Sequence, residues 1–460
     1  MILRDLELAP EVLRALAAHH PRRYPLLLDS AADGALSRFS VLLAEPSAAL
    51  WLDARGRLAA EGLDPQLLVA GAGFLDTLER WWLAERVPHG APAFGGGWAV
   101  YLGYELAEEI EPRLRLPPAA FPWRAFALRC PCALVHDRHT GTLRLVAEPQ
   151  AAASVPRILA EAREAAETLT PVASAPLPIE AVEEEAPEAY LERVRRAQRY
   201  IGEGQIYQAN LSRLWRAPLP AGASLAGLYE RLRTANPAPF AAWAQWGGGA
   251  ILSSSPERLV RITSGRLETR PIAGTRPRSG RAEEHAREVD ALVSHPKERA
   301  EHVMLVDLER NDLGRVCRAG TVRVEELMSI ESYRHVHHIV SSVTGELAAG
   351  LTPIAVLRAL FPGGTITGCP KVRCMQIIAE LEGAGRGPFT GALGWLGRDG
   401  DADFNILIRT LWTHDGTLEL RAGAGIVADS DPERELAETR AKARGLLAAL
   451  ARPQAGEPGA

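Results

Sequence analysis

The chain has 460 residues, 47% hydrophobic and 24% charged, which is ordinary for a globular protein of one very large domain or two to three smaller ones. A net charge of -5 and a pI near 6.2 give no general attraction to nucleic acid or to an anionic membrane surface. The N-terminus lacks a basic segment followed by an apolar stretch, and no run approaches about 18 apolar residues. We therefore expect a cytoplasmic protein without nucleic-acid or membrane partners.

Residues 1–150 have the pattern of a sheet-bearing N-terminal subdomain. Short helical stretches alternate with strand-like runs at 40–43 and 99–102, followed by a strand pair at 127–137 and 141–149. On one strand, Cys130 and Cys132 would place both thiols on the same side. Because the five cysteines are an odd set without metal-site spacing, we interpret them as reduced packing residues.

Residues 151–187 are rich in Ala, Pro and Glu, and we interpret them as a linker with a short helix near 156–167. The second unit, 188–450, opens with a helix whose apolar face is formed by Tyr190, Val194, Ala197 and Ile201. Gly202 and Gly204 end this helix before a strand at 207–215. Helices and strands then alternate up to a frayed tail at 451–460, which predicts an α/β or α+β fold.

Two Glu-x-x-Glu pairs lie in segments with helical patterns: Glu298 with Glu301, and Glu435 with Glu438. Each pair should project from one helix face. Such pairs are common on solvated helices, but these two adjoin an apolar run and a Gly-rich run, where unpaired carboxylates are costly. If the pairs converge, they would suit Mg²⁺, which prefers carboxylates, retained waters and an anionic substrate.

Seven segments occur in an order that resembles the chorismate-utilising enzymes, over roughly 186–450. They read SSSPERLV, RPIAGTRPRSG, EHVMLVDLERNDLGRV, SYRHVHHIVSSVTGEL, FPGGTITGCPKVRCMQII, IRTL and AGAGIVADSDPERELAETRAKA. That family includes the large subunits of anthranilate synthase and aminodeoxychorismate synthase and the isochorismate and salicylate synthases. The resemblance implies a large fold of two subdomains whose sheets pack face to face, with the active site in the C-terminal half.

The resemblance also implies that Glu298, Glu301, Glu435 and Glu438 surround a Mg²⁺ that binds the ring carboxylate of chorismate. Glu257 would be the general acid that protonates the departing C4 hydroxyl, because hydroxide is a poor leaving group. The alternative for Glu257 is a surface glutamate that follows a proline.

Further positions match binding residues of the family. Arg409 and Lys442 would hold substrate carboxylates, although Lys442 also has the spacing of an ordinary helix pair with Glu438. His338 matches an active-site histidine near the enolpyruvyl group. Residues without bulky side chains would let a ligand approach backbone N–H groups, unless they form plain tight turns: Gly423, Ala424 and Gly425, and Thr275 with the glycine before it.

Gln208 stands where the water-using members of the family carry a lysine base and the ammonia-using members carry glutamine. A neutral amide cannot activate water as a base, and ammonia needs no such activation. The resemblance therefore favours an ammonia user. Because the chain has no glutaminase motif with a nucleophilic cysteine, we expect a separate glutamine amidotransferase subunit.

The sequence shares features with both of the ammonia-using branches of the family. The segments 33–46, 207–211 and 236–240 look more like aminodeoxychorismate synthase component I, whose product leads to p-aminobenzoate and folate. Ala273 instead matches anthranilate synthase, because many aminodeoxychorismate synthases carry a nucleophilic lysine there. We expect aminodeoxychorismate synthase component I, with anthranilate synthase component I as the alternative. A non-catalytic chorismate- or tryptophan-binding protein is a third.

In this family the N-terminal half often forms a tryptophan pocket. The residues at matching positions are Ser30 on one side and Asn236, Pro237 and Phe240 on the other. The sequence leaves open whether tryptophan binds there as an inhibitor or as a structural ligand, and it leaves open the oligomeric state and the affinity for an amidotransferase.

Overall fold

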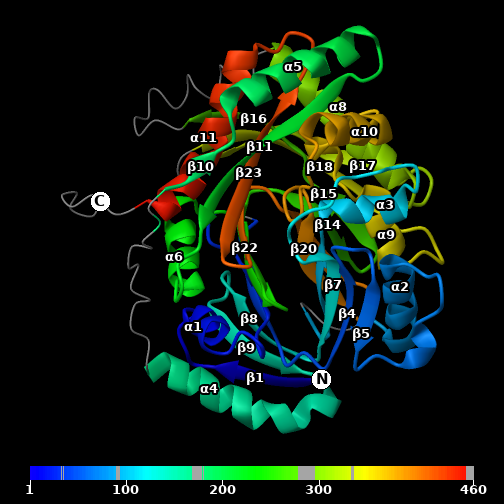
Figure 1. Cartoon of the computed structure of the whole chain (residues 1–460). Coiled ribbons are helices and arrows are strands. Elements are labelled where there is room, and N and C mark those ends of the chain that lie inside the picture. The colour runs from blue at the N-terminus through cyan, green and yellow to red at the C-terminus, as the bar shows by residue number, and fades with distance from the viewer. Residues whose placement is uncertain are drawn as a thin grey trace.

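The computed structural model describes residues 1–32, 34, 36–89, 94–167, 179, 181–277, 296–332 and 336–451, excluding the side chains of 273–277, 296–298, 332 and 336–338. In these residues two large antiparallel sheets lie at the centre and helices cover their outer sides (Figure 1). This mixed architecture confirms the expected fold class. None of the described helices is long and apolar enough to cross a membrane.

The first sheet, sheet A, contains twelve of the described strands, all paired antiparallel. In spatial order they are β1 (Ile2–Leu6), β9 (Thr142–Ala147), β8 (Cys132–Asp137), β3 (Phe39–Ala44), β2 (Leu26–Asp29), β12 (Phe240–Trp246), β13 (Gly249–Ser255), β22 (Thr410–His414), β23 (Thr417–Ile426), β11 (Gln208–Pro218) and β10 (Glu183–Glu184), and β19 (Gly368–Cys369) pairs with β11.

The second sheet, sheet B, contains eleven described strands. In spatial order they are β16 (Ile272–Pro277), β18 (Val336–Glu346), β15 (Arg266–Thr269), β14 (Arg258–Thr263), β21 (Ala402–Ile406), β20 (Ala392–Gly397), β6 (Gly97–Leu102), β7 (Trp123–Cys130), β4 (Ala48–Asp53) and β5 (Leu58–Glu61), and β17 (Arg323–Ser332) pairs with β18.

A buried apolar cluster joins the two sheets face to face, with residues such as Val41 and Ile251 from sheet A and Tyr101 and Leu393 from sheet B. A second cluster packs helices against the outer side of sheet A, namely α1 (Val12–His19), α4 (Val155–Glu167), α6 (Leu225–Ala235) and α11 (Pro432–Leu450). A third covers sheet B with α2 (Phe74–Glu85), α8 (Pro296–Gly314) and α9 (Pro353–Leu360).

A further cluster packs α5 (Pro187–Gly202) and α10 (Lys371–Glu382) against β11 and β23. The remaining helical segments are α3 (Ala107–Ile110) and the 3-10 turns η1 (Pro65–Leu67), η2 (Tyr104–Leu106), η3 (Pro149–Ser154) and η4 (Gly364–Ile366).

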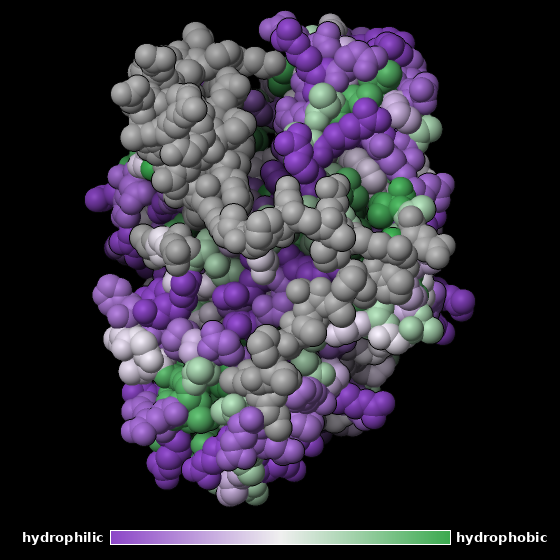
Figure 2. Space-filling model, turned by 90° about the vertical axis from the view of Figure 1, so that its left-hand side faces the viewer, coloured by the Kyte–Doolittle hydropathy of each residue, from purple (hydrophilic) through white to green (hydrophobic). Residues whose placement is uncertain are grey.

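Figure 2 shows the side of the molecule that lies on the left in Figure 1. Its coloured surface is largely hydrophilic with small apolar patches, which is normal for a protein surface.

Helix ends follow the local sequence. Ser224 caps α6, because its side chain accepts a hydrogen bond from the backbone N–H of Gly227. Helix α11 begins at Pro432, and the Asp431 side chain accepts from the N–H of Arg434. Helix α10 ends at Gly383, whose φ of 61° favours glycine.

The two halves of the chain share both sheets. In sheet A, β2 from the first half pairs with β12 from the second, and in sheet B, β6 pairs with β20. Helix α4 and strand β10 lie within the stretch interpreted as a linker. The boundaries at 150 and 187 remain predictions, as does the tail, whose residues 452–460 lie outside the described part of the chain.

The helix before Gly202 and the strand after it are confirmed as α5 and β11. The expectation of one strand carrying Cys130 and Cys132 is wrong. Pro131 separates β7 from β8, which belong to different sheets. Cys130 therefore packs between the sheets, whereas Cys132 packs under the helices of sheet A. All five cysteines are free thiols.

Candidate active site

Glu257 is a buried acid. It follows β13, its residue is 4% exposed, and its Oε1 accepts a 2.7 Å hydrogen bond from Thr365 Oγ1. Burial raises the pKa of Glu257 to about 7, although the hydrogen bonds from Thr365 and the Ile272 backbone and the charge of Lys442 oppose this rise. The alternative of a surface glutamate is excluded. A carboxyl group with this pKa can hold and donate a proton near neutral pH.

Thr365 is a contact that the sequence alone did not assign to Glu257. It lies in η4, where a side chain on the neighbouring Gly364 would come 3.2 Å from the Cβ of Leu308 in α8. A Cβ on Gly363 would lie 3.5 Å from the Leu259 side chain of β14, so η4 also packs beside the strand that follows Glu257. The Gly-Gly-Thr sequence is the only local feature that indicates a functional role for Thr365, and it does not show that Thr365 contacts Glu257.

Gln208, Glu301 and Gly425 meet at the end of β11. Gln208 Nε2 donates a 2.9 Å hydrogen bond to Glu301 Oε1. A Cβ on Gly425 would lie 2.2 Å from Gln208 Nε2 and 3.4 Å from Glu301 Oε1, so only glycine leaves room for this pair. Gln208 Oε1 is buried, and no described residue donates to it. The site therefore holds a neutral amide beside a carboxylate, with an amide oxygen free for a ligand.

Helix α11 carries the second predicted pair of glutamates. Glu435 is 9% exposed, whereas the Glu438 side chain is 48% exposed and lies 2.7 Å from Lys442 Nζ. The same Nζ donates a 3.0 Å hydrogen bond to the Gly423 carbonyl of β23. Lys442 thus forms the i,i+4 helix pair with Glu438, and it also reaches the Gly-rich strand that carries Gly423, Ala424 and Gly425.

Arg409 is a cation without an ion-pair partner in the described part of the chain. It lies between β21 and β22 with a φ of 53°, and its carbonyl accepts a 3.0 Å hydrogen bond from the Ser254 N–H. Burial lowers the pKa of Arg409 to about 10, and the charge of Glu438 opposes this change. The side chain is therefore still charged at neutral pH and suits an anionic ligand.

Four predicted residues are described only in their backbone. Ala273 and Thr275 lie on β16 and pair with Ile339 and His338 of β18. Glu298 lies in the first turns of α8, one helical turn before Glu301. The side chains of Ala273, Thr275, Glu298 and His338 lie outside the described residues, so their roles remain predictions.

The predicted Mg²⁺ ligands do not form one tight cluster among the described side chains. Glu301, Glu435 and Glu438 offer carboxylates, but in the described part of the chain their oxygens do not all lie within 4.8 Å of one another. Mg²⁺ commonly takes one or two direct carboxylates and keeps several waters, so a tight cluster is not required, and binding of Mg²⁺ here remains a prediction. The orphaned Gln208 Oε1 adds an oxygen of the right type at the same corner.

A second group of buried ionisable side chains interacts electrostatically with Glu257. Burial raises the pKa of Glu309 to about 8, and the charges of Asp312 and, to a smaller extent, Glu257 add to this rise. The charge of Lys371 opposes the rise. Lys371 Nζ donates to Asp312 Oδ2. The segment EHVMLVDLERNDLGRV had pointed to the family without assigning a role to its Glu309 or Asp312.

The residues of the predicted tryptophan pocket do come together. The N–H groups of Ala31 and Ala32 donate to the Ala238 carbonyl, Ser30 Oγ donates to the Phe39 carbonyl at 2.8 Å, and Asn236 Nδ2 donates to Ser254 Oγ at 3.0 Å. Pro237 lies between these contacts, and Phe240 lies under the guanidinium of Arg258 at 4.7 Å. Binding of tryptophan remains a prediction.

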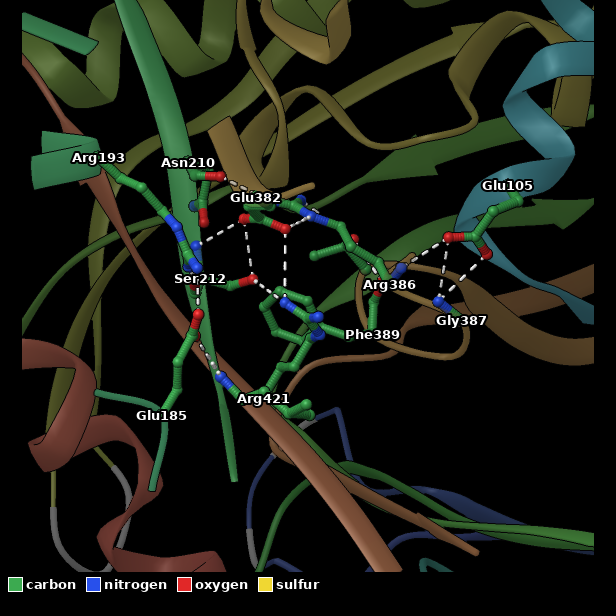
Figure 3. A network of polar contacts seen from close by, with 12 residues as sticks. Glu105, Glu185, Arg193, Asn210, Ser212, Glu382, Arg386, Gly387, Phe389 and Arg421 are labelled. Atoms are coloured by element: carbon green, nitrogen blue, oxygen red, sulfur yellow. Dashed lines mark hydrogen bonds and ion pairs between the residues drawn. The ribbon is translucent and has the colours of Figure 1, made fainter. Parts of the chain in front are cut away.

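A network centred on Glu382 supports the active-site strands (Figure 3). Glu382 Oε1 accepts hydrogen bonds from Arg386 Nη2 at 2.7 Å, Ser212 N at 2.8 Å and Ser212 Oγ at 2.9 Å. Arg421 Nη1 lies 3.5 Å from Glu382 Oε2, and Arg386 Nη2 donates to the Asn210 carbonyl. The network joins α10 to β11 and β23, the strands that carry Gln208 and Gly425.

Comparisons with known proteins identify the family of this chain. A model of the family described as chorismate binding enzyme matches residues 44–448. Anthranilate synthase component 1 of Streptomyces coelicolor is 43% identical over 385 residues, 80% of this chain and 75% of the relative. Aminodeoxychorismate synthase component 1 of Bacillus subtilis is 47% identical over 263 residues, 57% of this chain and 56% of the relative.

A solved structure shows the same fold. The crystal structure of anthranilate synthase component I from Streptococcus pneumoniae gives a TM-score of 0.79 at 30% identity and covers 90% of this chain and 93% of its own. The chain belongs to the chorismate binding enzyme family. Within it, the chain falls in the group of anthranilate and aminodeoxychorismate synthase component I proteins, and most of the similar relatives are named anthranilate synthase.

Proposed function

We propose that this protein is component I of an aminodeoxychorismate synthase, which replaces the C4 hydroxyl of chorismate with an amino group derived from ammonia. The observation that carries the ammonia-dependent chemistry is Glu257, a buried acid with a pKa of about 7, in a site where Gln208 supplies an amide instead of a base; the segments 33–46, 207–211 and 236–240 favour aminodeoxychorismate synthase over anthranilate synthase. This combination favours departure of a hydroxyl group and attack by an amine over activation of water.

The chemistry requires no covalent bond to the protein. Ala273 has no nucleophilic side chain, so we propose that ammonia itself adds to C2 of the ring while Glu257 protonates the C4 hydroxyl, which leaves as water. A second ammonia then adds to C4 and the first leaves from C2. The net reaction consumes one chorismate and one ammonia and yields 4-amino-4-deoxychorismate and water.

We propose that Glu298, Glu301, Glu435 and Glu438 hold Mg²⁺. When bound, the ion would neutralise the ring carboxylate of chorismate and orient the ring. The remaining substrate-binding roles belong to the chain itself. Arg409, which has no described ion-pair partner, would pair with a substrate carboxylate, and Lys442 would bind a carboxylate near the Gly423 carbonyl.

Anthranilate synthase component I is the second candidate, and two observations favour it. Ala273 stands at the position where anthranilate synthases carry alanine, and most of the similar relatives have that name. The first step would be the same. The C2 amine would then stay on the ring, and loss of pyruvate would give the aromatic 2-amino acid.

Identification of the product tests both candidates. The purified chain is incubated with chorismate, Mg²⁺ and ammonium above pH 8, and the products are separated by mass with and without an aminodeoxychorismate lyase. If p-aminobenzoate forms only with the lyase, the first proposal is supported. If anthranilate and pyruvate form without the lyase, the first proposal is wrong and the second is supported.

Both candidates need a source of ammonia. We propose a separate glutamine amidotransferase subunit as the partner of this chain, because the sequence contains no glutaminase motif and the similar relatives are named as component 1 proteins. In the test, the chain alone should use ammonium but not glutamine. Glutamine-dependent turnover by the chain alone would contradict this proposal.

A further inference from the structure

A histidine and two aspartates form a cluster at one end of sheet B, among strands that do not carry Glu257, Gln208 or the predicted Mg²⁺ ligands. His89 follows α2, and Asp399 and Asp401 lie in the hairpin between β20 and β21. One ligand atom from each residue lies within 4.8 Å of the other two. Among the residues that the structure describes, no other group of three or more His, Cys, Asp or Glu residues has ligand atoms this close together.

The distances match those between ligands of one metal ion. His89 Nδ1 lies 3.6 Å from Asp399 Oδ2 and 3.6 Å from Asp401 Oδ1, which is too long for a hydrogen bond. Tetrahedral ligands with bonds of ~2.0–2.1 Å to zinc lie ~3.3 Å apart. The two distances from His89 Nδ1 therefore need to shorten by only a few tenths of an ångström to reach this geometry, and the two carboxylate oxygens lie within 4.8 Å of each other.

The Asp399 carboxylate is an independent indication of a ligand. Its side chain is only 7% exposed, and its Oδ1 accepts one long hydrogen bond, 3.3 Å from the Asp401 N–H. No described residue donates a hydrogen bond to Oδ2, which faces His89. Beside it, the Asp401 side chain is 10% exposed. Two adjacent carboxylates with so little solvent repel one another, and a divalent cation between them would remove that cost.

The surroundings orient the imidazole for binding through Nδ1. Ser264 Oγ lies 2.9 Å from His89 Nε2; in the tautomer whose Nε2–H donates to this hydroxyl, the Nδ1 lone pair faces the two carboxylates. The backbone N–H of Ser264 also donates to Asp401 Oδ1 at 2.7 Å. Ser264 has a φ of 50° in the hairpin between β14 and β15, and it fixes both a histidine and a carboxylate of the cluster.

We propose that His89, Asp399 and Asp401 bind a divalent transition-metal ion, with Zn²⁺ the best match to one imidazole and two carboxylates. The ion would join the segment after α2 to the β20–β21 hairpin, which contacts the β14–β15 hairpin through Ser264. Its role would be structural. It would be independent of chorismate and of the proposed Mg²⁺ site.

The test measures Zn²⁺ binding in a background that lacks the competing glutamates. The triple variant Glu301→Gln, Glu435→Gln, Glu438→Gln is stripped with a chelator and titrated with Zn²⁺ in competition with a chromophoric indicator. We expect one ion per chain. Adding His89→Ala or Asp399→Asn should remove this binding, and adding Ser264→Ala should weaken it roughly tenfold or more. His139→Ala, at an exposed position in another hairpin turn, should leave it unchanged.

Thermal unfolding provides a second readout. Zn²⁺ should raise the Tm of the background chain and of the His139→Ala form, but not that of the His89→Ala form, because only a folded site binds the ion. Equal Zn²⁺ binding with and without His89 would overturn the proposal. Lack of any bound ion in a background chain that unfolds with the wild-type Tm would overturn it as well, and would identify the cluster as an imidazolium paired with two aspartates.

Discussion

Glu257 and Glu382 are both almost fully buried glutamates, 4% and 7% exposed as residues, yet their surroundings give them opposite protonation behaviour. Burial raises the pKa of Glu257 to about 7, because only a threonine hydroxyl, a backbone N–H and a more distant lysine oppose it. Burial would also raise the pKa of Glu382, but the charges of Arg386 and Arg421 and the hydrogen bond from Ser212 outweigh it and lower the pKa.

The difference separates an acid that can react from a charge that holds the fold together. Glu382 is an anion at neutral pH whose oxygens accept hydrogen bonds from its neighbours, so it has no proton to give there (Figure 3). Glu257 retains a proton near neutral pH because its neighbours compensate its charge poorly. Burial alone therefore does not make a glutamate a proton donor at neutral pH; its charge must also be poorly compensated by its neighbours.

The largest expected effect is on activity. Glu257→Gln removes the proton donor without a large change in shape, so we expect turnover of chorismate with ammonium to fall by about 10²- to 10⁴-fold. The exposed Glu380, on α10, provides a control as Glu380→Gln. A variant Glu257→Gln with wild-type turnover would show that another group protonates the leaving hydroxyl.

The same substitution should stabilise the protein at alkaline pH. The folded-state pKa of Glu257 lies above its ordinary value of 4.5, so its favourable contribution is complete below pH 4.5 and is lost as the pH rises through about 7. At pH 8 the buried carboxylate costs up to ~3 kcal/mol, from a shift of ~1.4 kcal/mol per pKa unit. Urea unfolding at pH 8 should therefore show Glu257→Gln to be more stable than wild type, and a less stable variant would contradict the assigned burial cost.

Glu382→Gln should have the opposite sign. It leaves Arg386 and Arg421 buried without their carboxylate, a loss of about 3–5 kcal/mol in the free energy of unfolding. Because the pKa of Glu382 is lowered from 4.5, its contribution is present above pH 4.5 and is lost as the pH falls through the lowered value. The gap in urea-unfolding free energy between variant and wild type should therefore narrow in acid, whereas Glu380→Gln should change stability by under about 1 kcal/mol.

The contrast between the two glutamates also marks the limit of what the sequence predicted. The motif around Glu257 pointed to an acid, and the alternation of helices and strands pointed to the fold class. Neither could predict that Thr365 reaches Glu257, since the two residues are 108 positions apart and only tertiary packing brings them together. The network around Glu382 was not predicted either: Arg386 follows only four residues later, which is a common spacing, but Ser212 and Arg421 lie on strands distant in the sequence.

The sequence also did not predict which strands of the two chain halves pair with each other. A strand pattern shows which residues face the core but not which strand lies beside it, so the joining of β2 to β12 and of β6 to β20 could not be predicted from local periodicity. Pro131 had a readable local meaning, since proline disfavours a continuous strand. The expectation for Cys130 and Cys132 failed because this local rule was given too little weight.

Gly425→Ala should damage the site more than the fold. The new methyl would lie 2.2 Å from Gln208 Nε2, so the amide must move and lose its hydrogen bond to Glu301. We expect a stability loss of about 1–3 kcal/mol and reduced turnover even where the variant is fully folded. Gly202→Ala, where nothing lies within 4 Å of the added carbon, is the matched control. Unchanged turnover in Gly425→Ala would show that the reaction does not depend on the position of the Gln208 amide.

The smallest expected effect is a displaced pH profile in Thr365→Val, and it tests the comparison most directly. The hydroxyl of Thr365 lowers the pKa of Glu257, so its removal should raise that pKa further above 7. Because the reaction needs the protonated acid, the alkaline limb of the rate should move to higher pH, by up to about one unit for a lost hydrogen bond to a charged group. The rate is measured at constant free ammonia, so that deprotonation of ammonium does not mask the limb. Thr365→Ser keeps the hydroxyl and should keep the wild-type profile. A limb that stays in place in Thr365→Val, or that moves to lower pH, would mean that the ionisation controlling the rate is not that of Glu257.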